Sequence, residues 1–422
     1  MRARLLVTVL VAVVAAAGAM ALGGGRALAS HVSCGDTITA DTTLDTDLVN
    51  CPNHGIVIGA DDVTLDLNGH LVDGDGTPAA DCDNQKEPCD FGLFNDGRDG
   101  VTVMHGSVRE FAVGVLFGTA TGRARHNRVL GVSATRNQFA GIGIFSQVRS
   151  LVRNSSGNGS LHREGIGLGL GDSQHVRILN NSFRHNPHNG INTGQSSRNL
   201  IRGNVFWRNG DEGILVEGAA RYRMTRNRFV RNGGGITLGP SNRSLVANNR
   251  IVGGSDGIRV EKGHDNLVAA NLVVGTRHVG ITLGIHDPFI GGADNVVRGN
   301  VVRRSGVDGI VVVEKDRHSE LIGNVVTRSA DDGFDVDSST TTLTANRAGR
   351  NGDLGIEAVF GVTDGGGNKA FGNDNPLQCT NITCNGNPLE CTNITRVVAS
   401  TALCSSQAVM PRWHLGRDPS GL

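Results

Sequence analysis

Five acidic side chains gather near the end of the regular part of this sequence. Asp331, Asp332, Asp335 and Asp337 lie within one short segment, and Glu357 follows 20 residues later. Carboxylates held close together bind Ca²⁺ or transfer protons, for example beside the carboxylate of a uronic acid, and a nearby cation would help to hold such a sugar. The candidate catalytic residues are therefore Asp335, Glu357, Lys315 and Arg259, and the candidate calcium ligands are Asp332, Asp335 and Asp337.

The same charges also fit a solvated surface. Glu261-Lys262 and Glu314-Lys315 carry adjacent charges of opposite sign, which is common on exposed faces with no ligand. A functional groove and a solvated acidic face therefore remain alternatives.

Other catalytic motifs are absent from the sequence. The histidines are scattered without metal-ligand spacing, and there is no glycine-rich phosphate loop or nucleophile elbow. His286-Asp287-Pro288 lies in the longest interval of the repeat described next, so we expect it in an outward loop over Ile285 to Ala293. Trp207 is the only obvious outward aromatic residue that the repeats predict.

A repeat of about 23 residues positions these side chains. Its clearest mark is a glycine followed by two alternating aliphatic residues, as in Glu212-Gly213-Ile214-Leu215-Val216 and Asp332-Gly333-Phe334-Asp335-Val336. Its second mark is an asparagine before a short aliphatic strand, as in Asn227-Arg228-Phe229 and Asn271-Leu272-Val273. Each repeat thus holds three short strands separated by Gly, Asn, Arg or Asp corners, without helical spacing.

Three strands per repeat predict a triangular coil whose strands stack on those of the next coil. We expect a single-stranded, all-β, right-handed parallel β-helix, a solenoid of about a dozen coils. The recurring Asn fits an inward corner residue, and the recurring Gly supplies either positive φ or room. The residue between the two aliphatic positions points outward. Stacking these positions gives one outward column: Asn192, Leu215, Thr237, Arg259, Thr282, Val311, Asp335 and Glu357.

These repeats resemble the parallel β-helix repeat of the pectin-lyase-like superfamily, over roughly Val101 to Asn387. The resemblance implies the fold and an exported protein, and the superfamily includes polysaccharide lyases, epimerases and glycosidases. Its catalytic motifs are mostly missing here. Asp331-Asp332 could serve as the paired aspartates of polygalacturonases, but their Gly-His-Gly and Arg-Ile-Lys are absent, and His286-Asp287-Pro288 has the wrong order for an alginate epimerase.

The two ends of the chain indicate export. Residues 1–29 have the basic start, apolar run and Ala27-Leu28-Ala29 site of a signal peptide. All eight cysteines lie toward the ends, which favours disulfides over zinc because no CxxC pair occurs. The cysteines are Cys34, Cys51, Cys82, Cys89, Cys379, Cys384, Cys391 and Cys404, and pairing of sequence neighbours is the simplest arrangement. We expect an N-terminal cap with entry coils over 30–100, repeats over 101–387 and an irregular tail over 388–422.

The charge balance gives no sign of a nucleic-acid or membrane partner. Lys+Arg and Asp+Glu are both 40, and the arginines are spread along the sequence, which is typical of a solvated face. We expect a secreted protein that binds or acts on an extracellular, acidic polysaccharide, of lyase or epimerase type if it is catalytic, with Ca²⁺ as the one candidate cofactor. The alternative is a non-catalytic, structural or surface-binding solenoid. The sequence does not fix the oligomeric state.

Overall fold

The computed structural model describes residues 31–77, 90–118, 122–284 and 291–384. These residues form strands and turns, and among them no helix is long and apolar enough to cross a membrane. The chain divides into two units at Asn385, and the first unit contains all of the described residues. Several predictions lie outside the described residues: the signal peptide, the 388–422 tail, Cys82, Cys89, Cys391, Cys404 and His286-Asp287-Pro288.

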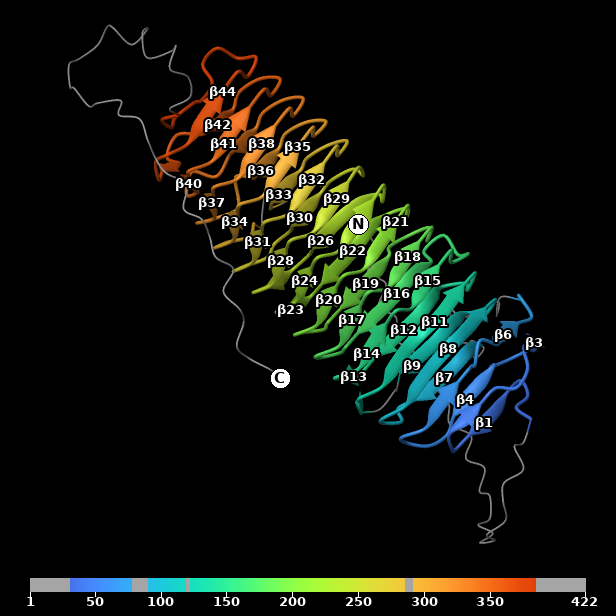
Figure 1. Cartoon of the computed structure of the whole chain (residues 1–422). Coiled ribbons are helices and arrows are strands. Elements are labelled where there is room, and N and C mark those ends of the chain that lie inside the picture. The colour runs from blue at the N-terminus through green and yellow to red at the C-terminus, as the bar shows by residue number, and fades with distance from the viewer. Residues whose placement is uncertain (1–30, 78–89, 119–121, 285–290, 385–422) are drawn as a thin grey trace, which may run out of the picture. The chain divides into compact units, whose positions relative to one another are not determined.

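The described chain is a parallel β-solenoid in which each coil contributes one strand to each of three sheets (Figure 1). Sheet 1 has 14 strands, one per coil, which is close to the predicted dozen. Its strands, in stacking order, are β1 (Asp36–Ile38), β4 (Ile56–Ile58), β7 (Phe91–Asp96), β9 (Val113–Gly118), β12 (Ala140–Phe145), β16 (Ile166–Gly171), β19 (Ile191–Gly194), β22 (Glu212–Glu217), β26 (Gly234–Leu238), β30 (Ile258–Val260), β33 (Ile281–Leu283), β36 (Ile310–Val312), β39 (Phe334–Val336) and β42 (Ile356–Ala358).

Sheets 2 and 3 follow sheet 1 within every coil. In two early coils a single long strand bends through both sheets, namely β8 (Thr102–Arg109) and β11 (Arg128–Thr135). The other strands of sheet 2 are β2 (Thr42–Thr43), β5 (Thr64–Asp66), β14 (Leu151–Arg153), β17 (Arg177–Leu179), β20 (Leu200–Arg202), β24 (Arg223–Thr225), β28 (Leu245–Ala247), β31 (Leu267–Ala269), β34 (Val296–Arg298), β37 (Glu320–Ile322), β40 (Thr342–Thr344) and β43 (Thr363–Asp364).

Sheet 3 closes each coil. Its other strands are β3 (Leu48–Cys51), β6 (Leu71–Gly74), β15 (Ser156–Asn158), β18 (Ser182–Arg184), β21 (Val205–Trp207), β25 (Arg228–Val230), β29 (Arg250–Val252), β32 (Leu272–Val274), β35 (Val301–Arg303), β38 (Val325–Thr327), β41 (Arg347–Gly349) and β44 (Lys369–Phe371). Two small additional pairs are β10 (Ala124–Arg125) with β13 (Gln147–Val148), and β23 (Ala219–Ala220) with β27 (Ser241–Asn242).

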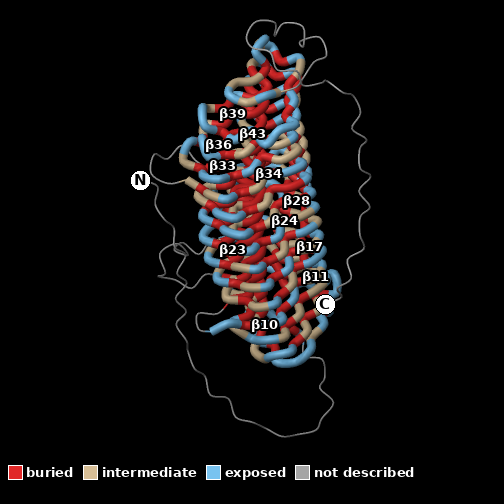
Figure 2. The backbone as a smooth tube through the Cα atoms, turned by 90° about the vertical axis from the view of Figure 1, so that its left-hand side faces the viewer, coloured by how far each residue is buried: buried red, intermediate tan, exposed pale blue. Residues whose placement is uncertain are grey.

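The core is a stack of alternating side chains along the inside of the coils. Buried and more exposed residues alternate along most strands of sheets 2 and 3, whereas some strands of sheet 1, such as β26 and β36, are buried throughout (Figure 2). Phe183, Phe206 and Phe229 stack inside sheet 3 at ring-centroid separations of 5.4 and 4.6 Å. Period-2 patterning therefore fixes which residues face inward and which face outward.

A buried asparagine ladder joins sheets 2 and 3, as predicted. The Asn227 side-chain oxygen accepts hydrogen bonds from the backbone N–H and the side-chain amide of Asn204, at 2.9 and 3.1 Å. The Asn227 amide donates to the Ile201 carbonyl at 3.0 Å and to Asn249 at 3.1 Å. Each asparagine thus satisfies groups of two neighbouring coils that the tight corner leaves unpaired.

The recurring glycine of sheet 1 is required for room and not for positive φ. A Cβ on Gly235 would lie 2.2 Å from the Gly257 carbonyl oxygen, and one on Gly257 would lie as close to that of Gly280. Neither glycine has positive φ. The left-handed corner positions hold other residues instead, for example Asn180 and Arg226.

Two of the predicted disulfides are present among the described residues. Cys34 is bonded to Cys51, and Cys379 is bonded to Cys384. Both disulfides join sequence neighbours and lie in the first and last coils.

Replacing Asn227 with alanine should destabilise the solenoid. The change removes the side-chain donor to the Ile201 carbonyl and the acceptor for the backbone N–H and side-chain amide of Asn204, at a cost of about 1–3 kcal/mol for each buried group left unpaired. Denaturant unfolding measures this loss. Asn192→Ala is the matched control because Asn192 faces outward on β19, and it should stay within about 0.5 kcal/mol of the unmodified chain. Equal stabilities of the two variants would contradict the ladder's role.

Candidate functional site

The register of sheet 1 places the predicted outward residues in one column. Thr237 pairs with Arg259, Arg259 with Thr282, Thr282 with Val311, Val311 with Asp335 and Asp335 with Glu357. This agrees with the sequence-based stacking at every position. Asp335 and Glu357 are therefore directly opposite on adjacent strands, where two like charges repel each other.

The acidic residues converge at the last coils of this column. Oxygen atoms of Asp308, Asp331 and Asp332 all lie within 4.8 Å of one another, which makes them a candidate group for a metal ion. Asp335 and Glu357 lie beside this group on β39 and β42. We call these five residues, together with Asp337 after β39, the carboxylate cluster.

Two members of the carboxylate cluster also brace the backbone. An Asp308 oxygen accepts a hydrogen bond from the Asp332 N–H at 2.9 Å, and an Asp332 oxygen accepts one from the Leu354 N–H at 2.6 Å. Both aspartates are buried. Their first role is therefore structural, since each carboxylate satisfies the N–H of the following coil.

Burial and mutual repulsion make these carboxylates hold their protons. Burial raises the pKa of Asp332 to about 8, with a hydrogen bond to Glu357 and the charges of Glu357 and Asp331 adding to the effect. Burial also raises the pKa of Asp335 to about 7, helped by the charges of Asp337 and Asp308. The cluster thus carries fewer charges at neutral pH than its composition suggests.

The two predicted cations do not join the carboxylate cluster. Arg259 lies three strands away from Asp335, or about 14 Å at the usual strand spacing. Lys315 forms an ion pair of 2.8 Å with its neighbour Glu314. The structure thus brings together Asp335, Glu357 and the predicted calcium ligands. Arg259 and Lys315 instead form ion pairs with other residues, Glu212 and Glu314.

Arg259 instead lies in a small pocket of sheet 1 that we call the Glu212 pocket. Its guanidinium contacts a Glu212 carboxylate oxygen at 2.7 Å and the Thr237 hydroxyl at 3.3 Å. It also lies 3.5 Å from Glu261 and 4.0 Å from Asp256. Gly234, which has no side chain, stands between Glu212 and Asp256 and leaves a cavity of about 100 Å³.

Glu212 has the electrostatics of an acid–base group. Burial, together with a hydrogen bond and the charge of Asp211, raises its pKa to about 7, although the charge of Arg259 opposes the rise. A carboxyl that titrates near neutral pH can both give and take a proton. Clefts that hold such groups are frequent functional sites.

Sequence reasoning missed Glu212 and Asp308 as site residues. Both precede the recurring glycine, at a position that was used only to mark the repeat. That position faces the same side of sheet 1 as the predicted column. An acidic residue directly before the glycine of the repeat could therefore have been read as a candidate site residue.

Other candidate ligands do not gather in the part of the chain that the structure describes. The carboxylates of Asp308, Asp331 and Asp332 are the one group found there that could hold a metal ion, with no histidine or cysteine in it. All-oxygen donors suit hard cations such as Ca²⁺ better than copper or zinc.

Two family models match parts of the chain. The model of the right handed beta helix region matches residues 164–290, and that of the periplasmic copper-binding protein NosD matches residues 253–376. No curated protein matches at a significant level. With the parallel stack of three sheets, these matches show that the chain is a right-handed parallel β-helix protein.

Several solved structures have a similar fold. A mutant of the periplasmic alginate epimerase AlgG is 14% identical, with 84% of this chain and 79% of the other covered and a TM-score of 0.43. An exopolygalacturonase from Thermotoga maritima is 10% identical, with 69% and 82% covered and a TM-score of 0.48. The Streptococcus pneumoniae surface adhesin PfbA is 11% identical, with 74% and 84% covered and a TM-score of 0.47.

If the carboxylate cluster binds calcium, the ion should stabilise the fold. A ligand present at 100 times its Kd stabilises by about 2.7 kcal/mol, so millimolar Ca²⁺ should raise the melting temperature measurably. Asp332→Asn keeps an oxygen for the Leu354 N–H but removes a charged ligand, and it should lose most of this rise. Glu320→Gln, an exposed change on sheet 2, should keep it. A melting temperature of the unmodified chain that does not change with calcium would show that the cluster binds no calcium and that its buried aspartates serve the fold alone.

The stability of the chain should depend on the protonation of Glu212. Its pKa is about 7 when folded against 4.5 for the free side chain, so the folded state binds the extra proton between these values. The contribution of Glu212 to stability is then greatest below about pH 4.5 and falls as the pH rises toward 7, by up to ~1.4 kcal/mol per pH unit. Glu212→Gln should flatten this slope in urea unfolding, whereas Glu217→Gln, at the exposed end of β22, should not. An unchanged slope in Glu212→Gln would refute the assignment.

Proposed function

We propose that this chain is an exported protein that binds an acidic polysaccharide along the outward face of sheet 1 and acts on it as a lyase or epimerase. The observation that supports this proposal is the Glu212 pocket. It holds a buried carboxyl and an arginine in contact with each other, together with a hydroxyl, inside a cleft. A uronic-acid residue requires this pair of groups, a cation for its carboxylate and a base for the neighbouring carbon.

The chemistry follows from the roles of these two side chains. Arg259 would pair with the sugar carboxylate and stabilise the negative charge that develops there when the adjacent carbon loses its proton. Glu212, released from Arg259 by the substrate, would accept that proton. In a lyase the bond to the glycosidic oxygen then breaks, a carbon–carbon double bond forms and the leaving oxygen takes up the proton that Glu212 accepted. In an epimerase water would protonate the carbon from the opposite side, and Glu212 would return its proton to the solvent.

The carboxylate cluster would serve as a second element of the same surface. We propose Asp332, Asp335 and Asp337 as calcium ligands, joined by Asp308 and Asp331, because an anionic sugar can approach so many carboxylates only if a cation lies between them. Asp335, Glu357 and Lys315 remain proposed catalytic residues, and a bound Ca²⁺ would supply the positive charge that Lys315, paired with Glu314, does not offer there.

Export is supported by the two disulfides in the first and last coils. Disulfides persist mainly in oxidising compartments outside the cytosol. We propose the extracellular space, with residues 1–29 as the signal peptide.

A non-catalytic solenoid is the second candidate, and one observation favours it. The Arg259 guanidinium already contacts Glu212, Thr237 and Glu261, so that its charge is largely used within the fold. In that case the sheet 1 face would bind glycan without changing it.

A screen of uronic-acid polymers separates the two candidates. A lyase produces unsaturated ends that absorb in the ultraviolet, and an epimerase changes the sugar composition seen by proton NMR. If the proposal is right, Glu212→Gln should lower kcat at least about 100-fold because it removes the general base, and Glu320→Gln should leave kcat unchanged. Binding without any product would establish the non-catalytic candidate, and neither binding nor product would refute both.

A further inference from the structure

The arginines of the middle coils gather on one side of the solenoid, away from sheet 1. Sheets 2 and 3 and the corner between them comprise residues 176–185, 199–208, 222–231 and 244–253 in four successive coils. These segments contain no Asp or Glu. They carry nine exposed arginines, which we call the arginine face: Arg177, Arg184, Arg202, Arg208, Arg223, Arg226, Arg228, Arg231 and Arg250.

The positions of these exposed arginines in the sequence do not show that they gather. They are spread in the sequence, but the coil period brings them together. None of the nine forms an ion pair with another described residue. The ion-paired arginines of the described chain are at other positions: Arg109, Arg123, Arg136, Arg163, Arg243 and Arg259.

The register arranges these charges in a regular array. On sheet 2, Arg177 pairs with Leu200 and Leu200 with Arg223, so that arginines recur at every second coil, about 10 Å apart. On sheet 3, Arg228 and Arg250 are directly opposite each other. Like charges in this position are destabilising, and no described carboxylate offsets them.

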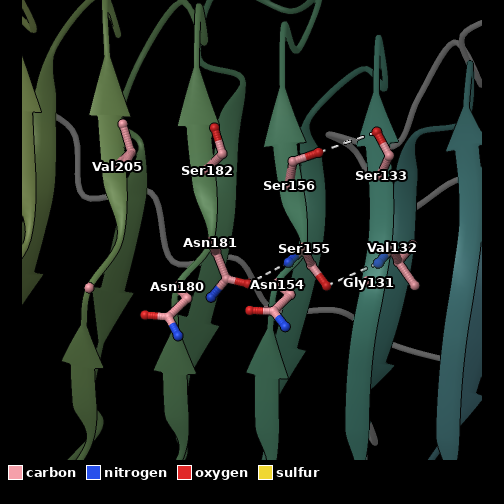
Figure 3. Close-up of a pocket in the computed structure, with 11 residues that line it drawn as sticks. Gly131, Val132, Ser133, Asn154, Ser155, Ser156, Asn180, Asn181, Ser182 and Val205 are labelled. Atoms are coloured by element: carbon pink, nitrogen blue, oxygen red, sulfur yellow. Dashed lines mark hydrogen bonds between the residues drawn. The ribbon is translucent and has the colours of Figure 1, made fainter.

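A groove of hydroxyl and amide groups leads into the arginine face (Figure 3). It has a volume of about 410 Å³, and its floor includes Ser133, Ser156 and Ser182 on successive strands of sheet 3, flanked by Asn154 and Asn180. The Ser156 hydroxyl donates to Ser133 at 3.2 Å, as Figure 3 shows.

The same column of sheet 3 continues past Ser182 through Val205 to Arg228. The Ser182 hydroxyl oxygen is buried and has no hydrogen-bond partner within the described chain, although it lines the groove.

Trp207 lies in the next outward column, beside this groove. It pairs in register with Arg184, whose guanidinium carbon is 5.9 Å from the ring centroid, and Arg208 lies 4.8 Å from it. His185 meets the ring edge-on at 4.6 Å. These contacts hold the two guanidinium groups over the surface and leave the ring less available for stacking with a ligand.

We infer that the groove and the arginine face together bind an anionic polysaccharide, one whose sugars bear carboxylate or sulfate groups. The repeated arginines match a repeating negative charge, and the serine and asparagine groups match sugar hydroxyls. Single-stranded nucleic acid fits less well because it binds on free aromatic platforms, and the one tryptophan here is already flanked by arginines. This surface is separate from the Glu212 pocket, so it does not depend on catalysis.

Binding of the full chain to defined polymers tests the inference. The probes are polygalacturonate and alginate for carboxylates, a heparin-type glycan for sulfates, neutral dextran, and single-stranded DNA. The test variant is Arg202→Gln with Arg223→Gln and Arg228→Gln. The control variant is Arg298→Gln with Arg303→Gln and Arg304→Gln, which removes the same charge from later coils of the same sheets. Thermal melts confirm that both variants fold.

The expected result is binding to one or both classes of acidic glycan, weakened at least tenfold in the test variant and less than twofold in the control. The salt dependence of binding should also decrease in the test variant, since fewer charges are neutralised. Ser156→Tyr, which fills the groove, should weaken glycan binding without changing the net charge.

Three outcomes would overturn the inference: no binding to any acidic glycan, equal losses in the two arginine variants, or DNA bound more tightly than every glycan. Loss of product formation in Glu212→Gln with glycan binding intact would test the proposed function alone, so the two proposals fail separately.

Discussion

The hydrogen bonds between one coil and the next are the constraint on which the rest of this structure depends. A coil of three short strands has no partner of its own for most of its backbone groups, so it is stable only when its neighbours are in register. The buried asparagines fix that register because each one bonds to the coils on both sides, as Asn227 does with Asn204 and Asn249. Once the register is fixed, outward side chains one repeat apart become neighbours.

Because of this register, residues that lie one or two repeats apart in the sequence become neighbours in a candidate site. Asp335 and Glu357 are 22 positions apart but directly opposite in sheet 1, and Glu212 and Arg259 are 47 positions apart but in contact. The fold holds these groups close together even though their mutual repulsion or burial has a cost, as the raised pKa values of Asp332, Asp335 and Glu212 show. Costs of this kind are typical of sites that bind a ligand, although structural carboxylate networks produce them too.

The fold and the sheet 1 column could be predicted because they depend on one short motif with a nearly constant period. The glycine and the two aliphatic residues after it define the strand, so the outward residue between them follows directly. Glu212 and Asp308 could not be assigned in this way because their side chains act across one or two coils, and their partners depend on a gap such as Gly234. The arginine face was missed for a related reason. Its members occupy several positions of the repeat, and only the three-dimensional stacking of sheets 2 and 3 places them on one surface.

The chain has no net charge, and this balance gives no sign that acidic and basic residues gather on different sheets. A solenoid can place acidic residues on one sheet and basic residues on the others because each sheet draws on a different third of the repeat. Steric and packing demands act only on the inward residues, which leaves the outward positions free to vary without loss of the fold. Arg228 opposite Arg250, with no described acid nearby, is therefore not a requirement of folding. A negatively charged partner outside the chain would relieve this repulsion, and the hydroxyl-lined groove beside it is the reason for proposing a sugar polymer as that partner.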